Sequence, residues 1–209
     1  MKDEESQIAS VGGDVSRETL AELARFVSHL DLWNRRLNLV SKADSNEIWH
    51  RHVQDSIQLF RFFPVDARRH MDIGSGGGFP GVVLSICLKH AGRQTLTKLV
   101  EADRRKAEFL RSAVRAFTLE ADVISRRVEN LPEDRADVIT ARAVAPLTKL
   151  LTYSLAQLAS NGVALFLKGR SWAEEVAAAR QAFLFDLNPH GSWTSPGSAV
   201  LEIRNIRRA

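Results

Sequence analysis

Residues 72–81 read Asp72-Ile73-Gly74-Ser75-Gly76-Gly77-Gly78-Phe79-Pro80-Gly81. Five glycines fall within eight positions here, after a short apolar run that ends at Ile73 and before a longer one that begins at Val82. Glycine is favoured where the backbone turns with a positive φ, or where it approaches a ligand so closely that no Cβ fits. The pattern predicts a strand, a ligand-binding turn and a helix, with the ligand at the carboxyl end of the strand.

Short apolar runs and helical stretches alternate from residue 70 onward. We expect strands at 70–73, 96–100, 122–124, 137–140 and 163–168, and helices at 82–90, 104–117 and 147–158. The remainder, 172–183 with 200–203 and its neighbours, supplies a last helix and one or two strands. This alternation is typical of a mostly parallel sheet with helices on both faces. The predicted class is therefore α/β, with a doubly wound, mostly parallel sheet, which is seven-stranded if the remainder supplies two strands.

The N-terminal third has helical rather than alternating periodicity. Residues 1–15 hold little apolar matter and are expected to form a flexible terminus, whereas apolar residues recur every three or four positions over 20–37. A second helix is expected after Asp44, which forms a capping box with Glu47, and it must stop near Pro64. We expect one domain over 16–209, with 16–66 as a helical cap.

Composition excludes several classes of protein. The 209 residues carry a formal net charge of +4 and 44% hydrophobic side chains, and no apolar run approaches the roughly 20 residues that span a bilayer. The first residues lack the basic-then-apolar order of a secretory signal, so a cytoplasmic location is expected. The single cysteine, Cys87, excludes an intrachain disulfide and is expected in the core. The six histidines show no ligand spacing, so no metal site is expected.

The basic side chains are mostly arginine, which forms bidentate contacts with phosphate and suits an RNA partner, although a solvated basic surface is the alternative. Arg36 and Arg51 are candidate RNA contacts, whereas Trp33 and Trp49 fall on apolar helical stripes and are expected in the core. Arg104 and Arg105 begin a helix, where positive charge is unfavourable to the helix dipole, so a phosphate contact is a better explanation than stabilisation.

Two cofactors compete for the glycine turn. A dinucleotide fingerprint, Gly-x-Gly-x-x-Gly, fails when counted from Gly74 because Phe79 occupies the third glycine position. Counted from Gly76 it matches, with Gly78 as its second glycine, but that register begins two residues later and contains Pro80.

Acidic residues favour a different ligand. Asp72, at the end of the strand, disfavours a nearby pyrophosphate and suits the ammonium and sulfonium groups of S-adenosylmethionine. Glu101 ends the next strand and is the candidate for gripping ribose hydroxyls, although it lies 27 residues after Gly74, beyond the roughly 20 of the dinucleotide rule. S-adenosylmethionine is therefore favoured over NAD.

Three further side chains are candidates for the chemistry. His52 and Asp55 stand three apart on the expected second helix, so they share a face and can hydrogen-bond; read alone, the pair favours a structural role. Arg142 follows the strand 137–140 at its carboxyl end, where ligands bind in such sheets, and this favours a functional role.

Seven segments, in order along the chain, resemble one family. They are Trp33-Asn34 with Asn38-Leu39-Val40-Ser41, His52-Val53-Gln54-Asp55-Ser56, the turn at 72–81, Arg127-Val128-Glu129, Ile139-Thr140-Ala141-Arg142-Ala143-Val144-Ala145, and Leu167-Lys168-Gly169. The chain is similar, over about residues 20–170, to the small-subunit ribosomal RNA guanine-N7 methyltransferases, also called glucose-inhibited division protein B. The turn together with Ala-Arg-Ala-Val-Ala is specific to that family.

The resemblance implies a Rossmann-like class I methyltransferase that acts as a monomer on 16S ribosomal RNA, within the small ribosomal subunit. It implies cofactor contacts from Gly74, Phe79, Val128, Glu129 and Arg142, places the His52–Asp55 face beside the guanine, and adds Lys168 to the RNA contacts. One departure is Ala102, where many members have serine after the acidic residue; alanine supplies no hydroxyl contact there.

Methylation at guanine N7 needs no general base, because N7 carries an unshared pair and no proton. The expected roles are therefore binding and orientation, with the Asp55 carboxylate stabilising the ring that becomes cationic. Two other functions stay open from the residues alone: an NAD-linked oxidoreductase and a non-catalytic RNA-binding assembly factor.

Overall fold

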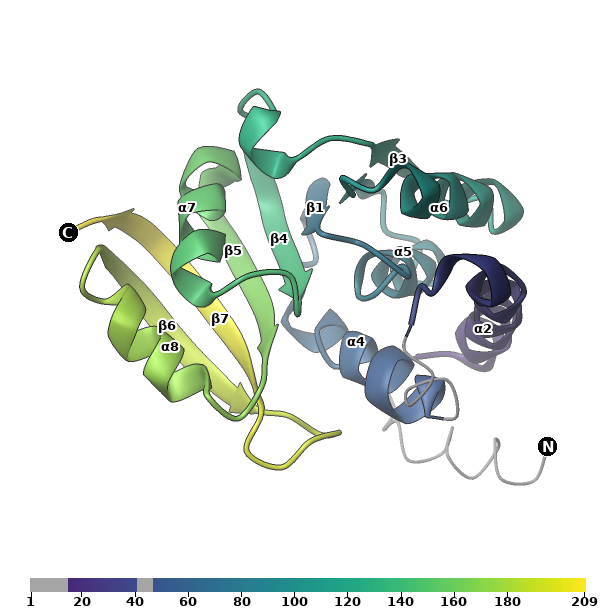
Figure 1. The fold of residues 1–209 in the computed structure, drawn as a ribbon, viewed down its shortest axis with the longest axis horizontal. Coiled ribbons are helices and arrows are strands. Elements are labelled where there is room, and N and C mark those ends of the chain that lie inside the picture. The colour runs from purple at the N-terminus through teal and green to yellow at the C-terminus, as the bar shows by residue number, and fades with distance from the viewer. Residues whose placement is uncertain (1–14, 41–46) are drawn as a thin grey trace.

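The computed structural model describes residues 15–40 and 47–209 of the 209-residue chain. A seven-stranded sheet with the order β3-β2-β1-β4-β5-β7-β6 forms its centre (Figure 1). The strands are β1 (Arg69–Ile73), β2 (Leu96–Val100), β3 (Ala121–Ile124), β4 (Ala136–Arg142), β5 (Leu158–Lys168), β6 (Phe183–Gly191) and β7 (Ala199–Arg208). The first five are parallel, and β7 runs antiparallel to both β5 and β6. The predicted α/β sheet is confirmed.

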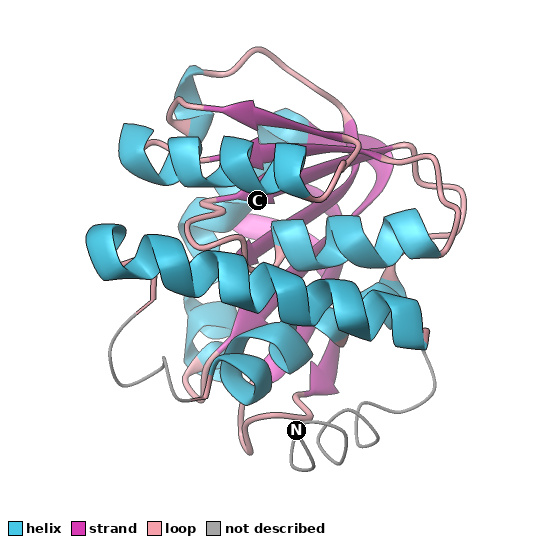
Figure 2. Cartoon of the chain, turned by 90° about the vertical axis from the view of Figure 1, so that its right-hand side faces the viewer, coloured by secondary structure: helices cyan, strands magenta, loops and turns pink. Residues whose placement is uncertain are grey.

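Helices cover both faces of this sheet. The helices are α2 (Arg17–Leu37), α4 (Asp55–Ile57), α5 (Gly81–His90), α6 (Arg104–Ala116), α7 (Leu147–Gln157) and α8 (Trp172–Ala179). One buried cluster joins α2, α5 and α6 to one face, and Figure 2 shows helices in front of the strands on that side. A second cluster joins α7 and α8 to the opposite face. Cys87 is buried within the first cluster, as predicted.

The order of the strands reverses between β1 and β4. The chain moves outward from β1 through β2 to β3, then returns to β4 on the other side of β1. In open α/β sheets such a reversal leaves a crevice at the carboxyl ends of the two strands, because their crossovers run to opposite sides. The glycine turn follows β1 and Arg142 ends β4, so both lie at this crevice.

The expected second helix is not a regular α-helix. Residues 49–54 form a π-helix, η1 (Trp49–Gln54), which continues into the short α4 and then a 3-10 turn, η2 (Phe60–Phe62). π-helical turns are rare in proteins, and those that occur are often found at functional sites. Periodicity could not distinguish an α-helix from a π-helix here, because the spacing of apolar residues only indicates that one face of the helix is buried. The predicted cap by Asp44 lies outside the described residues.

Candidate functional site

The glycine turn is tied to the neighbouring strand. The backbone amides of Gly74 and Ser75 both donate to the carbonyl of Val100, at 2.8 and 3.1 Å. Gly74 has a φ of +72°, and a Cβ there would lie 2.2 Å from Cγ2 of Val144, on the loop that follows β4. The turn therefore passes against the opposite wall of the crevice, with bare backbone where any side chain would collide.

Glu101 is fixed at the end of β2 by this turn. Its Oε2 accepts from the amide of Gly76 at 2.9 Å, and its Oε1 accepts from the amide of Asp103 at 2.8 Å. A carboxylate has about four acceptor positions, so the two that remain can accept hydroxyls of a ligand. This placement fits the role predicted for Glu101.

A cavity of about 380 Å³ opens between the turn and the loop after β4; we term it the glycine-loop cavity. Of the predicted cofactor residues, it is lined by Gly74, Gly76, Glu101, Val128, Glu129 and Arg142. It is also lined by residues that were not predicted to contact the cofactor, namely Lys106, Arg126, Arg127, Lys149 and Tyr153.

Tyr153 and Lys149, on α7, both act on Glu129. The Tyr153 hydroxyl donates to Oε1 of Glu129 at 2.7 Å, and Nζ of Lys149 lies 3.7 Å from the same oxygen. The hydrogen bond from Tyr153 lowers the pKa of Glu129, so the carboxylate stays charged at neutral pH. The sequence held no signal for these residues, because only the packing of α7 against the sheet brings them to the cavity.

Asp72 lies beneath the turn and does not line the cavity. It is fully buried, with Oδ1 accepting from the Thr140 hydroxyl at 2.6 Å and Oδ2 accepting from the Gly81 amide at 3.2 Å. These bonds fasten the end of β1 to β4 and to the start of α5. A direct contact between Asp72 and a ligand stays a prediction. Burial raises the pKa of this carboxyl to about 6.

We expect Asp72→Asn to change how stability depends on pH. The Asp72 carboxyl has a pKa of about 4 in the unfolded protein and about 6 in the folded protein. Between these two pH values the folded protein binds more protons than the unfolded protein. The free energy of unfolding therefore falls as the pH rises through this window. The wild type should lose about 1 kcal/mol more unfolding free energy than the variant on going from about pH 5 to about pH 7.5. Denaturant unfolding at both values measures this.

The other titrating groups are common to both proteins and cancel in that comparison. If the variant fails to fold, the Asp72 carboxyl can be titrated directly in the wild type by NMR. Equal pH dependence, or an NMR midpoint near the ordinary aspartate pKa of about 4, would show that Asp72 is charged throughout.

Phe79 and Gly78 also belong to the packing below the turn. The Phe79 ring meets Phe26 edge-on at 5.7 Å between ring centroids and stacks on His52 at 5.0 Å. A Cβ at Gly78, whose φ is +89°, would lie 2.8 Å from the Phe26 ring. Neither residue lines the glycine-loop cavity, so a cofactor contact from either stays a prediction. The arrangement connects η1, which carries His52, to the turn.

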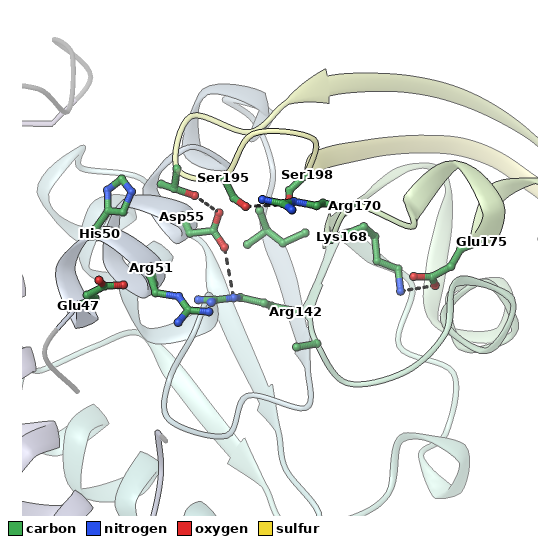
Figure 3. Close-up of a pocket in the computed structure, with 14 residues that line it drawn as sticks. Glu47, His50, Arg51, Asp55, Arg142, Lys168, Arg170, Glu175, Ser195 and Ser198 are labelled. Atoms are coloured by element: carbon green, nitrogen blue, oxygen red, sulfur yellow. Dashed lines mark hydrogen bonds and ion pairs between the residues drawn. The ribbon is translucent and has the colours of Figure 1, made fainter. Parts of the chain in front are cut away.

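A second cavity, of about 730 Å³, lies beside the first; we term it the arginine cavity because Arg51, Arg142 and Arg170 line it (Figure 3). Its walls come from η1 and α4, the carboxyl ends of β4 and β5, and the loop between β6 and β7. This loop supplies Thr194, Ser195 and Ser198, none of which was predicted. Segments far apart in the sequence thus build one concave site, lined by four basic and three acidic side chains.

Asp55 is the centre of polar contacts in the arginine cavity. Its Oδ1 accepts from the Thr194 hydroxyl at 2.8 Å and from Nε2 of Gln58 at 2.7 Å. Its Oδ2 lies 3.3 Å from Nε of Arg142, and Figure 3 shows the two side chains pointing toward each other. The pair is largely buried, with 14% of the Asp55 side chain and 18% of the Arg142 side chain exposed. Asp55 therefore joins α4, β4 and the β6–β7 loop.

Arg142 and Ala143 line both cavities. They stand where β4 ends, and Ala143 has a positive φ of +50°, which turns the chain sharply between the two spaces. A ligand in the glycine-loop cavity and a ligand in the arginine cavity would both reach this point. The arrangement suits a transfer of a group from one bound molecule to another.

Lys168 is engaged by the protein. Its side chain is 8% exposed, its Nζ lies 2.6 Å from Oε2 of Glu175, and it donates to the carbonyl of Ala145 at 2.9 Å. The same Glu175 oxygen accepts from the amide of Leu147 at 2.7 Å. Together these contacts hold the loop after β4 against α8. Lys168 lines the arginine cavity, but its contact with RNA stays a prediction.

The remaining candidate RNA contacts are dispersed. Arg51 lines the arginine cavity, whereas Arg36, Arg104 and Arg105 line neither cavity. The side chain of Asp103 caps α6 by accepting from the amide of Arg105 at 2.8 Å, and this offsets the positive charge at that helix start. RNA contacts from these arginines stay predictions. Trp33 and Trp49 pack against the core, as predicted.

Two further findings concern metal binding and membrane insertion. Among residues 15–40 and 47–209, no three His, Cys, Asp or Glu side chains gather in a group able to hold a metal ion. In the same part of the chain, no helix is both long and apolar enough to cross a membrane.

The chain is similar to known proteins in sequence and in fold. Residues 19–197 match the family model described as rRNA small subunit methyltransferase G. The chain is 42% identical to Ribosomal RNA small subunit methyltransferase G of Ruegeria sp. (strain TM1040), covering 93% of this chain and 95% of that protein. It is 41% identical to the protein of the same name from Cereibacter sphaeroides, covering 97% and 98%.

Solved structures are similar in fold at low identity. A SAM dependent methyltransferase from Aquifex aeolicus superposes with a TM-score of 0.60 at 12% identity, covering 78% of this chain and 95% of that one. M. jannaschii TYW2 in complex with AdoMet gives a TM-score of 0.57 at 15% identity, covering 76% of each chain.

Proposed function

The chain belongs to the rRNA small subunit methyltransferase G family, and on that premise we propose that it transfers a methyl group from S-adenosylmethionine to N7 of a guanine in 16S ribosomal RNA. The observation that carries the proposal is the pair of cavities that meet at Arg142 and Ala143. The smaller one has a glycine cradle and two acidic residues, and the larger one is lined by arginines. We also infer a cytoplasmic location, where ribosomal RNA is assembled into subunits.

The residues of the glycine-loop cavity fit S-adenosylmethionine. The bare backbone at Gly74 lets the turn lie directly against Val144 in the cavity wall, and Glu101 keeps free acceptor positions for ribose hydroxyls. Val128 and Glu129 would bound the other end of the ligand, and the basic residues Lys106 and Lys149 suit its carboxylate. When bound, S-adenosylmethionine supplies an electrophilic methyl group on a sulfonium.

The chain's own residues bind and orient the guanine. N7 has no proton to lose, so no side chain need act as a base; holding N7 in line with the methyl group is the requirement. Such positioning can lower a barrier by about 7–11 kcal/mol. In the arginine cavity, Asp55 holds Arg142 by an ion pair, and with guanine bound there its carboxylate would stabilise the positive charge that develops on the ring.

The test is to follow a radiolabelled methyl group from S-adenosylmethionine to its acceptor. Small ribosomal subunits from cells that lack the enzyme should accept a radiolabelled methyl group from S-adenosylmethionine, and the label should map to N7 of one guanine in 16S rRNA, detected by chain scission at the modified base. Free 16S rRNA serves as the comparison that identifies the true substrate. Label on protein, or at another atom of the RNA, would overturn the proposal.

A further inference from the structure

Trp193 is exposed, unlike the other tryptophans of the chain. It lies in the loop between β6 and β7 with 45% of its surface exposed, whereas Trp33, Trp49 and Trp172 are partly buried against the two core clusters. A large aromatic ring left in water forgoes the stabilisation of burial, and residues of this kind are enriched where macromolecules bind.

The backbone around Trp193 is held in place. Its amide donates to Oε1 of Gln58 at 3.2 Å, and on the next residue the Thr194 hydroxyl donates to Asp55. The loop is also closed on itself, because the amide of Ser192 donates to the carbonyl of Ser198 at 2.9 Å. Figure 1 shows this loop reaching the side of α4. An exposed ring on an ordered loop loses little conformational freedom when a ligand binds.

Basic and aromatic side chains surround the indole. The guanidinium carbon of Arg61 lies 5.1 Å from the Trp193 ring centroid and 5.0 Å from that of Phe62, and Phe62 stacks on His190 at 4.0 Å. We term Arg61, Phe62, His190 and Trp193 the Trp193 patch. Flat arginine and aromatic groups together form the surface on which proteins stack unpaired nucleobases, with arginine available to phosphate.

The Trp193 patch adjoins the arginine cavity. Thr194 and Ser195, the next residues of the same loop, line that cavity, and Arg51 and Arg170 line it as well. A strand of RNA whose guanine enters the cavity must leave it over a rim, and the exposed Arg51 and Arg170 favour its phosphates there.

We propose that the Trp193 patch is a stacking platform for an unpaired nucleotide next to the methylated guanine. This inference rests on the proposed function, and it adds a surface that the cofactor and guanine cavities do not include. Stacking on aromatic side chains tolerates every base, so the patch contributes affinity and register more than sequence choice. RNA is favoured over a protein partner because the patch combines cationic and aromatic groups beside a cavity that takes a nucleobase.

The kinetic test uses unmethylated small ribosomal subunits. Trp193→Ala should raise KM for subunits roughly tenfold, with kcat and the affinity for S-adenosylmethionine unchanged, whereas Trp193→Phe keeps a ring and should stay within about twofold of wild type. Leu184→Ala is the matched control, because Leu184 is equally exposed at 45% and lies at the other end of β6. An unchanged KM in Trp193→Ala, or equal losses in the alanine and phenylalanine variants, would overturn the proposal.

Binding without catalysis separates this inference from the proposed function. A short single-stranded oligoribonucleotide should quench tryptophan emission more in the wild type than in Trp193→Phe, even if the methyl acceptor were misassigned. If Trp193→Ala binds subunits poorly but the oligonucleotide equally well, the patch contacts a ribosomal protein and the RNA proposal is wrong. Failure of the wild type to methylate subunits would instead count against the proposed function.

Discussion

Gly74→Ala is expected to weaken the binding of S-adenosylmethionine by at least roughly 100-fold, equivalent to about 2.7 kcal/mol, while the sheet still folds. Two costs combine at this position. The φ of +72° is unfavourable for alanine, and the new Cβ would lie 2.2 Å from Cγ2 of Val144, in the wall of the glycine-loop cavity. Relief of that contact requires the turn or the wall to move, and either movement changes the cavity. Calorimetry with S-adenosylmethionine or S-adenosylhomocysteine measures the effect.

Gly92→Ala is the matched control for Gly74→Ala. Gly92 also has a positive φ, +65°, but a Cβ there meets nothing within 4 Å, and the residue lies in the turn after α5. Its substitution should lower stability by about 1 kcal/mol and leave cofactor affinity unchanged. Near-normal affinity in a folded Gly74→Ala protein would remove the glycine turn from the cofactor site.

Arg142→Lys is expected to lower kcat/KM for small subunits by at least roughly 100-fold. The substitution keeps the charge but loses the planar fork, which in this chain approaches Asp55 from the point where the two cavities meet. A lysine cannot keep both the Asp55 contact and the position of the guanidinium. The loss should appear in kcat, measured with both substrates saturating, because the substitution changes how the two bound substrates are oriented relative to each other.

Arg170→Lys tests whether any arginine of the arginine cavity would respond in the same way. Arg170 is exposed and lines the arginine cavity but not the glycine-loop cavity. Its substitution should therefore raise KM no more than about threefold, through a weakened RNA contact. Because Asp55 and Arg142 are largely buried, thermal unfolding must show that Arg142→Lys is folded at the assay temperature. Activity within threefold of wild type would show that the junction does not orient the substrates.

The fold was predictable because its signals are local. Apolar runs, helical periodicity and the glycine turn each occupy a few consecutive residues, and together they specify a parallel sheet with its ligand site after β1. The choice between S-adenosylmethionine and NAD also followed from neighbouring residues, and the family match agrees with it. The NAD-linked oxidoreductase is set aside by the same match.

The contacts of two candidate site residues were not predictable from the sequence. Asp72 is fully buried and braces β4 and α5, and Lys168 is paired with Glu175 beneath the loop after β4. The sequence shows that a charged residue ends a strand, but not whether its side chain turns toward solvent or into the protein. That direction depends on which neighbours the sheet supplies.

Local pattern alone was sufficient for the class of fold, the turn at Gly74 and the kind of cofactor, since backbone conformation and periodicity are properties of consecutive residues. The wall shared by the two cavities, the contacts of Asp55 with Ser192 and Thr194, and the exposure of Trp193 arose only from tertiary structure. Asp55 lies 137 and 139 residues before its partners in the β6–β7 loop. The physical reason is that the antiparallel β6–β7 pair carries this loop back to α4, and no periodicity in the chain encodes a contact over that distance.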